Sequence, residues 1–368
     1  MIESLFLVLF FGTLAIYLIY CSCFYFRFAF YKEPVYTTSF EPVSIIVAAH
    51  NELHQLKELI PHLIKQNYPQ FEIIIVDDRS DDDTYVFLTE QAKAYSQLKI
   101  VRVEVTPDKI SSKKYALILG IKAASYNTIL LTDADCFPAS SEWIQEMQKG
   151  FSSNKEIVLG YSPYVKKKGF LNLFIRYETF YTAFQYFSFA LAGVPYMGVG
   201  RNLSYKKKLF LQNKGFGKHL SVIGGDDDLF INQVANRDNT NIVIHPSSYI
   251  YSFPKTTWKE WFLQKKRHLS VGKYYRWKHQ FLLSLFAISG LLFQISFFVL
   301  VSISSSWEGI VGVYLARMIV LVLILNKSNK KLNEKISPFL LPLLDVLHTF
   351  YCVGMGIVAV FSKKVRWK

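Results

Sequence analysis

The chain has 368 residues, 51% of them hydrophobic, and a formal net charge of +14 at pH 7. This hydrophobic share, with a positive mean hydropathy, is high for a soluble protein, so we expect a part embedded in a membrane. The four cysteines lack metal-ligand spacing and imply no disulfide framework. Basic residues flank apolar stretches and no nucleic-acid recognition motif accompanies them, so the charge favours an anionic bilayer over nucleic acid as partner.

Four stretches contain almost no charged residues: 4–26, 281–303, 310–325 and 338–361. The first two approach or exceed the ~20 residues that span the hydrocarbon of a bilayer. The third is short and contains Arg317, and the last contains two prolines together with Asp345 and His348. We therefore predict two or three C-terminal spans, and the last stretch is compatible with either a span or a re-entrant helix.

The N-terminal stretch differs from a cleaved signal peptide. Glu3 precedes the apolar run, no Lys or Arg does, and no small-residue cleavage site follows. Arg27 and Lys32 come next, so the positive-inside rule predicts an uncleaved anchor over residues 1–27, with the following domain in the cytoplasm. Basic residues also flank the later stretches and favour the cytoplasmic side for each of those flanks. If all three C-terminal stretches crossed the bilayer, these flanks could not all be cytoplasmic.

Between residues 42 and 161, short apolar runs alternate with segments of helical spacing. Strands are predicted at 43–48, 73–76, 100–103 and 128–132, and helices at 53–64, 84–94, 114–124 and 142–151. Strand and helix units in series specify an α/β fold with a mostly parallel central sheet. In such sheets ligands bind beyond the carboxyl ends of the strands.

Acidic or polar clusters follow three of these strands: His50-Asn51-Glu52, Asp77-Asp78 and Asp133-Ala134-Asp135. One carboxylate after one strand is ordinary turn chemistry. A convergent set repels itself and needs a cation or a ligand rich in hydrogen-bond donors. Mg²⁺ and Mn²⁺ prefer carboxylate oxygens, so Asp133 and Asp135 are predicted to hold one of these ions against phosphates.

These motifs and others occur in the order found in the family 2 glycosyltransferases, which have a GT-A fold. From about residue 41 to 272 the chain resembles that family in PVSIIVAAHNE, IIIVDDRSDDDT, KKYAL, ILLTDADC, GGDDDL and QKKRH. The predicted organisation is an anchor over 1–27, a GT-A domain over 41–255, an amphipathic interfacial segment with a Gln-x-x-Arg motif over 256–279, and a membrane region over 280–362.

The resemblance implies a site for a nucleotide-sugar donor, and each residue has an ordinary structural alternative. Asp135 is implied to bind the metal and Asp133 to bind the ribose or the metal. Acids after a strand also cap helices, and a lone lysine is usually exposed. The other residues assigned to the donor are Ala48, His50, Glu52, Asp77, Asp78 and Lys113.

Gly225 stands where the family commonly has a glutamate, and Asp226 aligns with the catalytic base. Asp227 is the reserve candidate, although adjacent acids also cap the helix that is predicted to follow. Gln264, Arg267 and His268 match the Gln-x-x-Arg-Trp pattern with His in place of Trp, and they are implied to face the donor. The same segment suits an amphipathic helix at the membrane surface.

Two further segments are of interest for the structure and for the acceptor. Residues 170–191 are aromatic and fit either a core helix or a helix against the membrane, and residues 198–202 resemble the family's glycine-containing acceptor loop. The resemblance implies a metal-dependent inverting transfer from a UDP- or GDP-sugar to a lipid, lipid-linked or glycan acceptor at the cell membrane. The alternatives are a processive polysaccharide synthase and a catalytically silent subunit that binds a nucleotide sugar.

Overall fold

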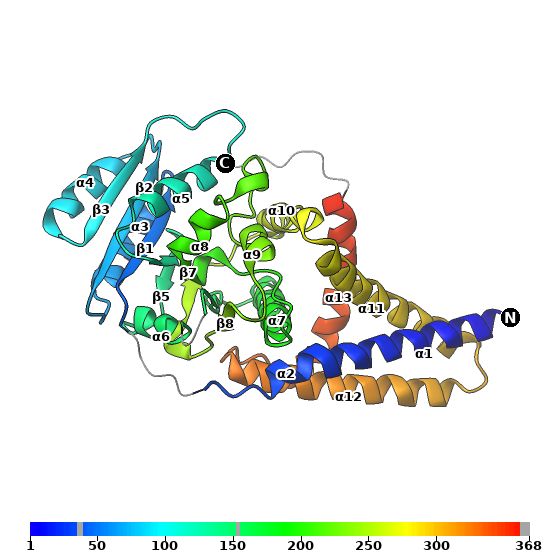
Figure 1. Ribbon diagram of the computed structural model, residues 1–368. Coiled ribbons are helices and arrows are strands. Elements are labelled where there is room, and N and C mark those ends of the chain that lie inside the picture. The colour runs from blue at the N-terminus through cyan, green and yellow to red at the C-terminus, as the bar shows by residue number, and fades with distance from the viewer. Residues whose placement is uncertain (35–39, 152–154, 361–368) are drawn as a thin grey trace. The chain divides into compact units, whose positions relative to one another are not determined.

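A computed structural model describes residues 1–34, 40–151 and 155–360 (Figure 1). The chain divides into two compact units. The sheet unit comprises Glu33–Lys167 and Gly193–Lys255, and the helical unit comprises Met1–Lys32, Lys168–Ala192 and the chain from Thr256 onward. Phe361, which ends the last predicted apolar stretch, and residue 362, which ends the predicted membrane region, lie outside the described residues.

A seven-stranded sheet forms the centre of the sheet unit, in the order β3-β2-β1-β4-β7-β6-β8. Four neighbouring strands are parallel, whereas β7 runs antiparallel to both β4 and β6, and β8 pairs in parallel with β6. This confirms the predicted α/β fold with a mostly parallel sheet. The strands are β1 (Val43–Ala49), β2 (Phe71–Asp78), β3 (Leu98–Val103), β4 (Thr128–Leu131), β6 (Ile157–Leu159), β7 (Leu203–Lys206) and β8 (Thr240–Ile242).

The helices and strands predicted up to residue 151 all occur, with ends that shift by a few residues. Beyond them, β5 (Cys136–Pro138) and β9 (Ile250–Ser252) form a separate two-stranded antiparallel sheet. The helices of this unit are α3 (Leu53–Ile64), α4 (Thr84–Ala94), α5 (Ser112–Ala123), α6 (Trp143–Lys149), α8 (Lys207–Gln212) and α9 (Asp228–Val234).

Helices cover both faces of the parallel strands, which explains why these strands are continuous apolar runs. On one face, Val47 of β1 and Ile75 of β2 share a buried core with Leu59 of α3. On the other face α5 lies so close that a Cβ on Gly120 would be 2.7 Å from Cγ2 of Ile46. The strands are therefore fixed in place, and their carboxyl ends form a rigid edge.

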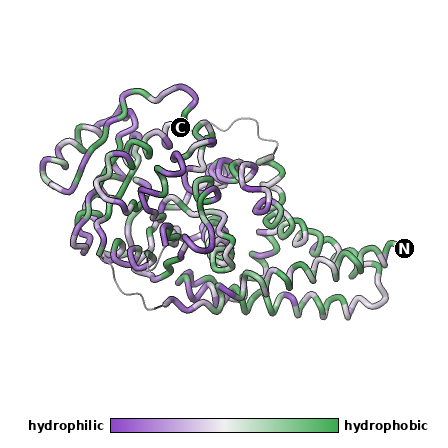
Figure 2. The backbone as a smooth tube through the Cα atoms, viewed as in Figure 1, coloured by the Kyte–Doolittle hydropathy of each residue, from purple (hydrophilic) through white to green (hydrophobic). Residues whose placement is uncertain are grey.

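The helical unit contains long apolar helices, which are hydrophobic along most of their length (Figure 2). Four segments are long and apolar enough to cross a membrane: Ile2–Ala29, Trp277–Ile303, Trp307–Lys331 and Pro338–Ala359. They support a membrane location. The first joins α1 (Ile2–Tyr20), a π-helical turn (Cys21–Tyr25) and α2 (Phe26–Ala29), and the others contain α11 (Trp277–Ile303), α12 (Trp307–Lys331) and α13 (Leu341–Val360).

The third candidate span is longer than the predicted stretch 310–325, because α12 extends through polar residues at both ends. α13 is one continuous helix after a short 3-10 turn.

The aromatic stretch 170–191 forms α7 (Phe170–Leu191), which belongs to the helical unit. Phe184 contacts the rings of Tyr25 and Phe28, and Tyr181 contacts His348 of α13. Most of the side chains of α7 are buried, which fits the core-helix alternative.

Candidate functional site

The carboxyl ends of β1, β2 and β4 lie at one edge of the sheet, which we call the acidic edge. The registers pair Ala49 with Asp77 across β1 and β2, and Ile46 with Leu131 across β1 and β4. The residues that follow neighbouring parallel strands lie at the same edge of the sheet. The acids that follow the three strands are thus neighbours in space, as the sequence predicted.

The loops after β1 and β2 are tied together by polar contacts. The Asn51 amide donates to Oγ of Ser80 at 2.9 Å, and the Asp81 amide donates to Oδ1 of Asn51 at 2.8 Å. His50 Nδ1 lies 2.7 Å from the carbonyl oxygen of Asp78, which can only accept, so Nδ1 carries the hydrogen. His50 therefore fixes the loop through the backbone of a predicted donor residue.

Asp77 and Asp78 lie on opposite faces of β2, because side chains alternate along a strand. Asp78 is buried, and its Oδ1 accepts from Nε of Arg79 at 2.9 Å. Asp77 is fully buried, and neither of its carboxylate oxygens has a hydrogen-bond partner among the described residues. Ala48 precedes this pair of loops on β1 and is partly buried.

Glu52 lies at the start of α3, facing the other acids of the edge. Burial above all, and then the nearby charges of Asp135 and Asp133, raise its pKa to about 8, against an opposing effect of Lys113. The like charges add to the effect of burial because they repel the ionised carboxylate of Glu52. The acidic edge as a whole therefore favours the binding of a cation.

Lys113, at the start of α5, joins two parts of the acidic edge. Its Nζ lies 2.8 Å from Oδ1 of Asp133 and 3.2 Å from Oδ2 of Asp226. Burial opposes its charge, but Asp133 and Asp226 outweigh burial and hold the pKa of Lys113 well above its ordinary value. The Lys113 ammonium group thus links Asp133 of the predicted metal pair to Asp226, the predicted base.

The next residue, Lys114, points elsewhere and anchors the loop that leads to Asp226. Its Nζ donates to the carbonyl oxygens of His219 at 2.6 Å and Val222 at 2.9 Å, and its side chain is fully buried. Ser111 adds a backbone bond from its amide to the carbonyl of Leu220. The start of α5 therefore positions both Lys113 and the chain before Asp226.

Asp227 has a structural environment that Asp226 lacks. Its Oδ1 accepts from the Asp228 amide at 2.8 Å at the start of α9, and its Oδ2 accepts from the Gly200 amide at 2.6 Å. Burial and the neighbouring Asp226 raise the pKa of Asp227. Both oxygens of Asp227 are occupied by the fold, and Asp226 is the acid that pairs with Lys113.

The predicted metal pair has a donor set that suits a divalent cation. One carboxylate oxygen from each of Asp133 and Asp135 and the thiol of Cys136 lie within 4.8 Å of one another. Asp135 is exposed, whereas Cys136 is buried, and burial raises the pKa of its thiol well above the ordinary value. Two hard carboxylate oxygens with an exposed side are typical of Mg²⁺ or Mn²⁺ bound together with phosphates.

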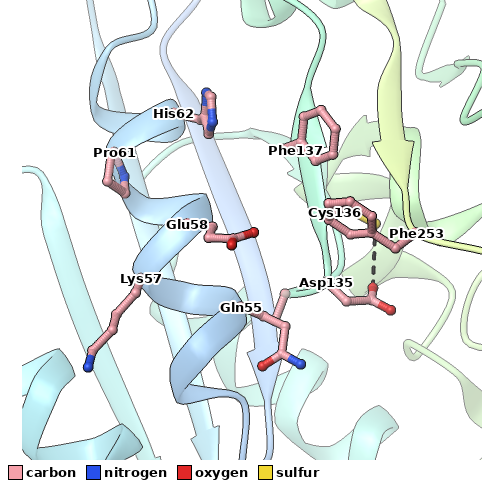
Figure 3. A pocket seen from close by; sticks show the side chains of 10 residues that line it. Gln55, Lys57, Glu58, Pro61, His62, Asp135, Cys136, Phe137 and Phe253 are labelled. Atoms are coloured by element: carbon pink, nitrogen blue, oxygen red, sulfur yellow. Dashed lines mark hydrogen bonds between the residues drawn. The ribbon is translucent and has the colours of Figure 1, made fainter. Parts of the chain in front are cut away.

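A cavity of about 430 Å³ adjoins Asp135 between α3 and the β5–β9 sheet (Figure 3). Its polar lining includes Gln55 and Glu58 of α3, and its apolar lining includes Phe137 and Phe253. Sγ of Cys136 lies 3.5 Å from Oδ1 of Asp135 at the cavity wall. Asp135 thus lines an open cavity.

Three predicted donor residues are not part of the sheet unit. Gln264, Arg267 and His268 lie on α10 (Trp258–Leu269) of the helical unit. This helix buries Trp261 and Lys265 and exposes apolar side chains, including Phe262 and Leu263, beside basic ones. Such a surface is typical of an amphipathic helix, and the role of these three residues toward the donor stays a prediction.

Known proteins resemble the chain in sequence and in fold. Residues 44–211 match the sequence model of the family Glycosyl transferase family 2. The chain is 25% identical to the probable glycosyltransferase YdaM of Bacillus subtilis over 244 residues, which are 63% of this chain and 55% of that protein. It is 32% identical to the poly-beta-1,6-N-acetyl-D-glucosamine synthase of Staphylococcus epidermidis over 131 residues, 33% of this chain and 30% of that one.

Two further comparisons extend this result. Over 100 residues the chain is 37% identical to the beta-monoglucosyldiacylglycerol synthase of Trichormus variabilis, covering 27% of this chain and 21% of that protein. The mannosyltransferase PcManGT from Pyrobaculum calidifontis, solved with GDP-Man and Mn²⁺, has a TM-score of 0.64 at 14% identity, covering 99% of this chain and 100% of that one. The chain spans about half, or less, of the length of these curated relatives.

The sheet unit has the predicted GT-A fold, whereas residues 168–192 of the predicted domain 41–255 belong to the helical unit. Residues 44–211 are similar in sequence to Glycosyl transferase family 2. Sequence reasoning gave residues 198–202 only as a resemblance to an acceptor loop and did not expect Gly200 and Arg201 at the acidic edge. The signal available was the motif Gly-x-Gly-Arg-Asn, in which a glycine at a close approach precedes a cation.

Proposed function

We propose that this protein is an inverting glycosyltransferase that moves a sugar from a nucleoside diphosphate donor to a hydroxyl group of a lipid, lipid-linked or glycan acceptor. The observation that carries this proposal is the arrangement around Lys113, which contacts Asp133 of the metal pair and Asp226. A metal pair and a base within reach of one lysine fit a reaction in which a diphosphate leaves as a hydroxyl group attacks.

Asp226 is the proposed base. Its carboxylate would take the proton of the acceptor hydroxyl while that oxygen attacks the anomeric carbon from the side opposite the diphosphate, which inverts the configuration. Lys113 orients Asp226 through the contact at 3.2 Å. Asp227 is less suited to this role, because both its oxygens already accept backbone hydrogen bonds.

Asp135 and Asp133 are the proposed ligands of Mg²⁺ or Mn²⁺. When bound, the cation neutralises the negative charge that develops on the leaving diphosphate. Asp135 is exposed and would be the principal ligand, whereas Asp133 shares one oxygen with Lys113. The charges of Asp135 and Asp133, which add to burial in raising the pKa of Glu52, support the binding of a cation there.

The donor would bind along the carboxyl ends of β1 and β2. We assign its nucleoside to the loops held by His50 and Asn51, with Ala48, Glu52, Asp77 and Asp78 around it. The unpartnered carboxylate of Asp77 supports this assignment, because a buried acceptor without a donor is costly unless something completes it. Gln264, Arg267 and His268 would bind the diphosphate from α10.

The acceptor is proposed to belong to the membrane or to a growing glycan. The four candidate spans support an enzyme anchored at the bilayer, and Arg27 and Lys32 after the first span favour a cytoplasmic catalytic domain. Two relatives are named as synthases of a glycolipid and of a polysaccharide. The second name favours a processive synthase as the alternative, and the length of the product formed from one acceptor distinguishes the two.

The test is sugar transfer and donor hydrolysis by purified protein in detergent. UDP- and GDP-sugars are supplied with Mg²⁺ or Mn²⁺, and Asp135→Ala is compared with Asp238→Ala, which removes an exposed acid before β8. We expect metal-dependent turnover that Asp135→Ala abolishes and Asp238→Ala leaves unchanged. Equal activity of Asp135→Ala and the parent protein would refute the metal site, and binding of nucleotide with no turnover on any acceptor would indicate a silent subunit.

A further inference from the structure

Arg201 is a second cation at the acidic edge. It lies in the 3-10 turn Gly200–Asn202, directly before β7. The antiparallel register pairs Leu131, the last residue of β4, with Leu203, the first residue of β7, so the turn that holds Arg201 lies at the same edge of the sheet as Asp133. The charges of Asp133 and Asp135 act on the Arg201 guanidinium there.

The surroundings of Arg201 hold its guanidinium in one place. The group lies over the ring of Tyr164, 4.6 Å from the ring centroid, and its Nη2 donates to the carbonyl oxygen of Ser162 at 3.3 Å. The next residue, Asn202, is fully buried and makes hydrogen bonds to Trp143 and to the carbonyls of Tyr161 and Ser248. A turn fixed by this many contacts presents its arginine in a defined position.

One nitrogen of Arg201 is left over. Nη1 is buried and has no hydrogen-bond partner among the described residues. The negative charges that act on the guanidinium include those of Asp133 and Asp135. Lys113 already contacts Asp133 and Asp226, so of these two cations Arg201 is the one with a spare donor. A buried donor without a partner is costly, which is a reason to expect that substrate completes it.

The position of Arg201 indicates which part of a donor it would meet. The preceding residue, Gly200, donates its amide to Asp227, and a Cβ at Gly200 would lie 3.2 Å from Oδ2 of that acid. Asp227 adjoins the proposed base Asp226, which must approach the anomeric carbon of the sugar. In a nucleoside diphosphate sugar that carbon is bonded to an oxygen of the distal phosphate.

We propose that Arg201 binds the distal phosphate of the donor through Nη1 and stabilises it as the leaving group. This inference rests on the proposed glycosyl transfer and adds a residue to it. As the bond from the acceptor oxygen to the anomeric carbon forms, the bond from that carbon to the phosphate oxygen breaks, and its electron pair stays on the phosphate. The acceptor proton goes to Asp226, and Arg201 opposes the new negative charge.

The test measures nucleotide affinity in the presence of Mn²⁺, by calorimetry on the full chain in detergent. UDP and UMP are compared, or GDP and GMP if the protein prefers guanine. Arg201→Gln should weaken binding of the diphosphate about 10- to 100-fold, as expected for loss of a charged hydrogen bond, and change binding of the monophosphate less than about twofold. Arg201→Lys, which keeps the charge, should recover part of the loss.

Arg237→Gln is the matched control, because Arg237 is exposed and precedes β8 at the opposite edge of the sheet, and it should leave both affinities unchanged. The unliganded thermal midpoint of each variant reports on folding. Equal weakening of diphosphate and monophosphate, or no weakening of either, would overturn the role of Arg201. Absence of any nucleotide binding by the parent protein would instead refute the proposed function itself.

Discussion

The two units bury charged side chains in opposite ways. In the helical unit the buried charges form pairs: Arg317 lies 3.2 Å from Asp345, Arg176 contacts Glu334 at 2.6 Å, and Lys265 contacts Glu178. In the sheet unit at least five acids gather near Lys113 and Arg201, and both carboxylate oxygens of Asp77 and Nη1 of Arg201 have no hydrogen-bond partner among the described residues. Paired charges serve structure, whereas an unbalanced group of charges serves a ligand.

The pairs of the helical unit hold apolar helices to one another. Arg317 of α12 also lies over the rings of Tyr17 and Phe293, at 4.5 and 5.1 Å from their centroids. A single ionised residue among apolar helices is expensive, and a pair with an aromatic shell offsets part of that cost. In the sequence, Arg317 and Asp345 are unusual charged residues within apolar stretches. In the fold they form an ion pair with each other, which accounts for both.

The largest effect is expected from separate substitutions of Asp226 and Asp227, the neighbouring acids at the start of α9. Asp226→Asn should lower the turnover number about 10²- to 10⁴-fold, because a general base contributes that much, while donor affinity with Mn²⁺ is retained. Asp227→Ala should instead lower the stability of the protein, by about 1 kcal/mol for a lost helix cap, with a smaller loss of turnover. Steady-state kinetics and thermal unfolding separate the two outcomes. The reverse pattern would assign the base to Asp227.

The next effect concerns the pair Arg317 and Asp345. Asp345→Ala should destabilise the helical unit by about 3–5 kcal/mol, because it leaves the arginine buried without its partner. Arg317→Leu together with Asp345→Leu should recover most of that loss. The measurement is thermal unfolding in detergent micelles. If the double variant is no more stable than Asp345→Ala, the pair has a role other than mutual compensation.

The smallest effect is expected at Glu72, a paired acid of the sheet unit that lies away from the acidic edge. Its oxygens accept from Ser44 at 2.6 Å and from the Ser125 amide at 2.5 Å, and Lys99 lies 2.5 Å away. Burial opposes ionisation, but Lys99, Ser44 and Ser125 outweigh it and lower the pKa of Glu72. Glu72→Gln should therefore cost about 1–2 kcal/mol at pH 7, allowing for the half-exposed Lys99.

The sign of the pH dependence follows from the lowered pKa of Glu72. The ionised carboxylate stabilises the fold above the pKa of the unfolded chain, near ~4.3, and this contribution is lost as pH falls through the lower pKa of the folded state. The difference in stability between the parent protein and Glu72→Gln should shrink as pH falls below about 4. A difference that stays constant down to pH 3 would show that the hydrogen bonds do not depend on the charge.

Much of the sheet unit could be predicted because its signals are local. The apolar runs that became β1, β2 and β4 are bounded by polar clusters, and parallel topology alone brings Glu52, Asp77 and Asp133 to one edge. Short strands such as β6 and β8, with three residues each, carry too little periodicity to be recognised.

Other parts of the site depended on contacts between residues far apart in the chain. Lys113 and Lys114 are neighbours in a helix and look alike in the sequence, yet one joins Asp133 to Asp226 and the other holds the carbonyls of His219 and Val222. Sequence alone likewise left Asp226 and Asp227 as alternatives for the base. The Gly200 amide, which engages Asp227, separates them in the structure.

The sequence by itself determined the fold class, the apolar helices at both ends and the strand-end acids, because each of these follows from periodicity or composition within a short segment. Only the tertiary structure decided which charges face one another: Arg317 with Asp345 in the helical unit, and Lys113 with Asp133 in the sheet unit. Electrostatic energy depends on distances of a few ångströms between residues distant in the chain, and folding fixes those distances.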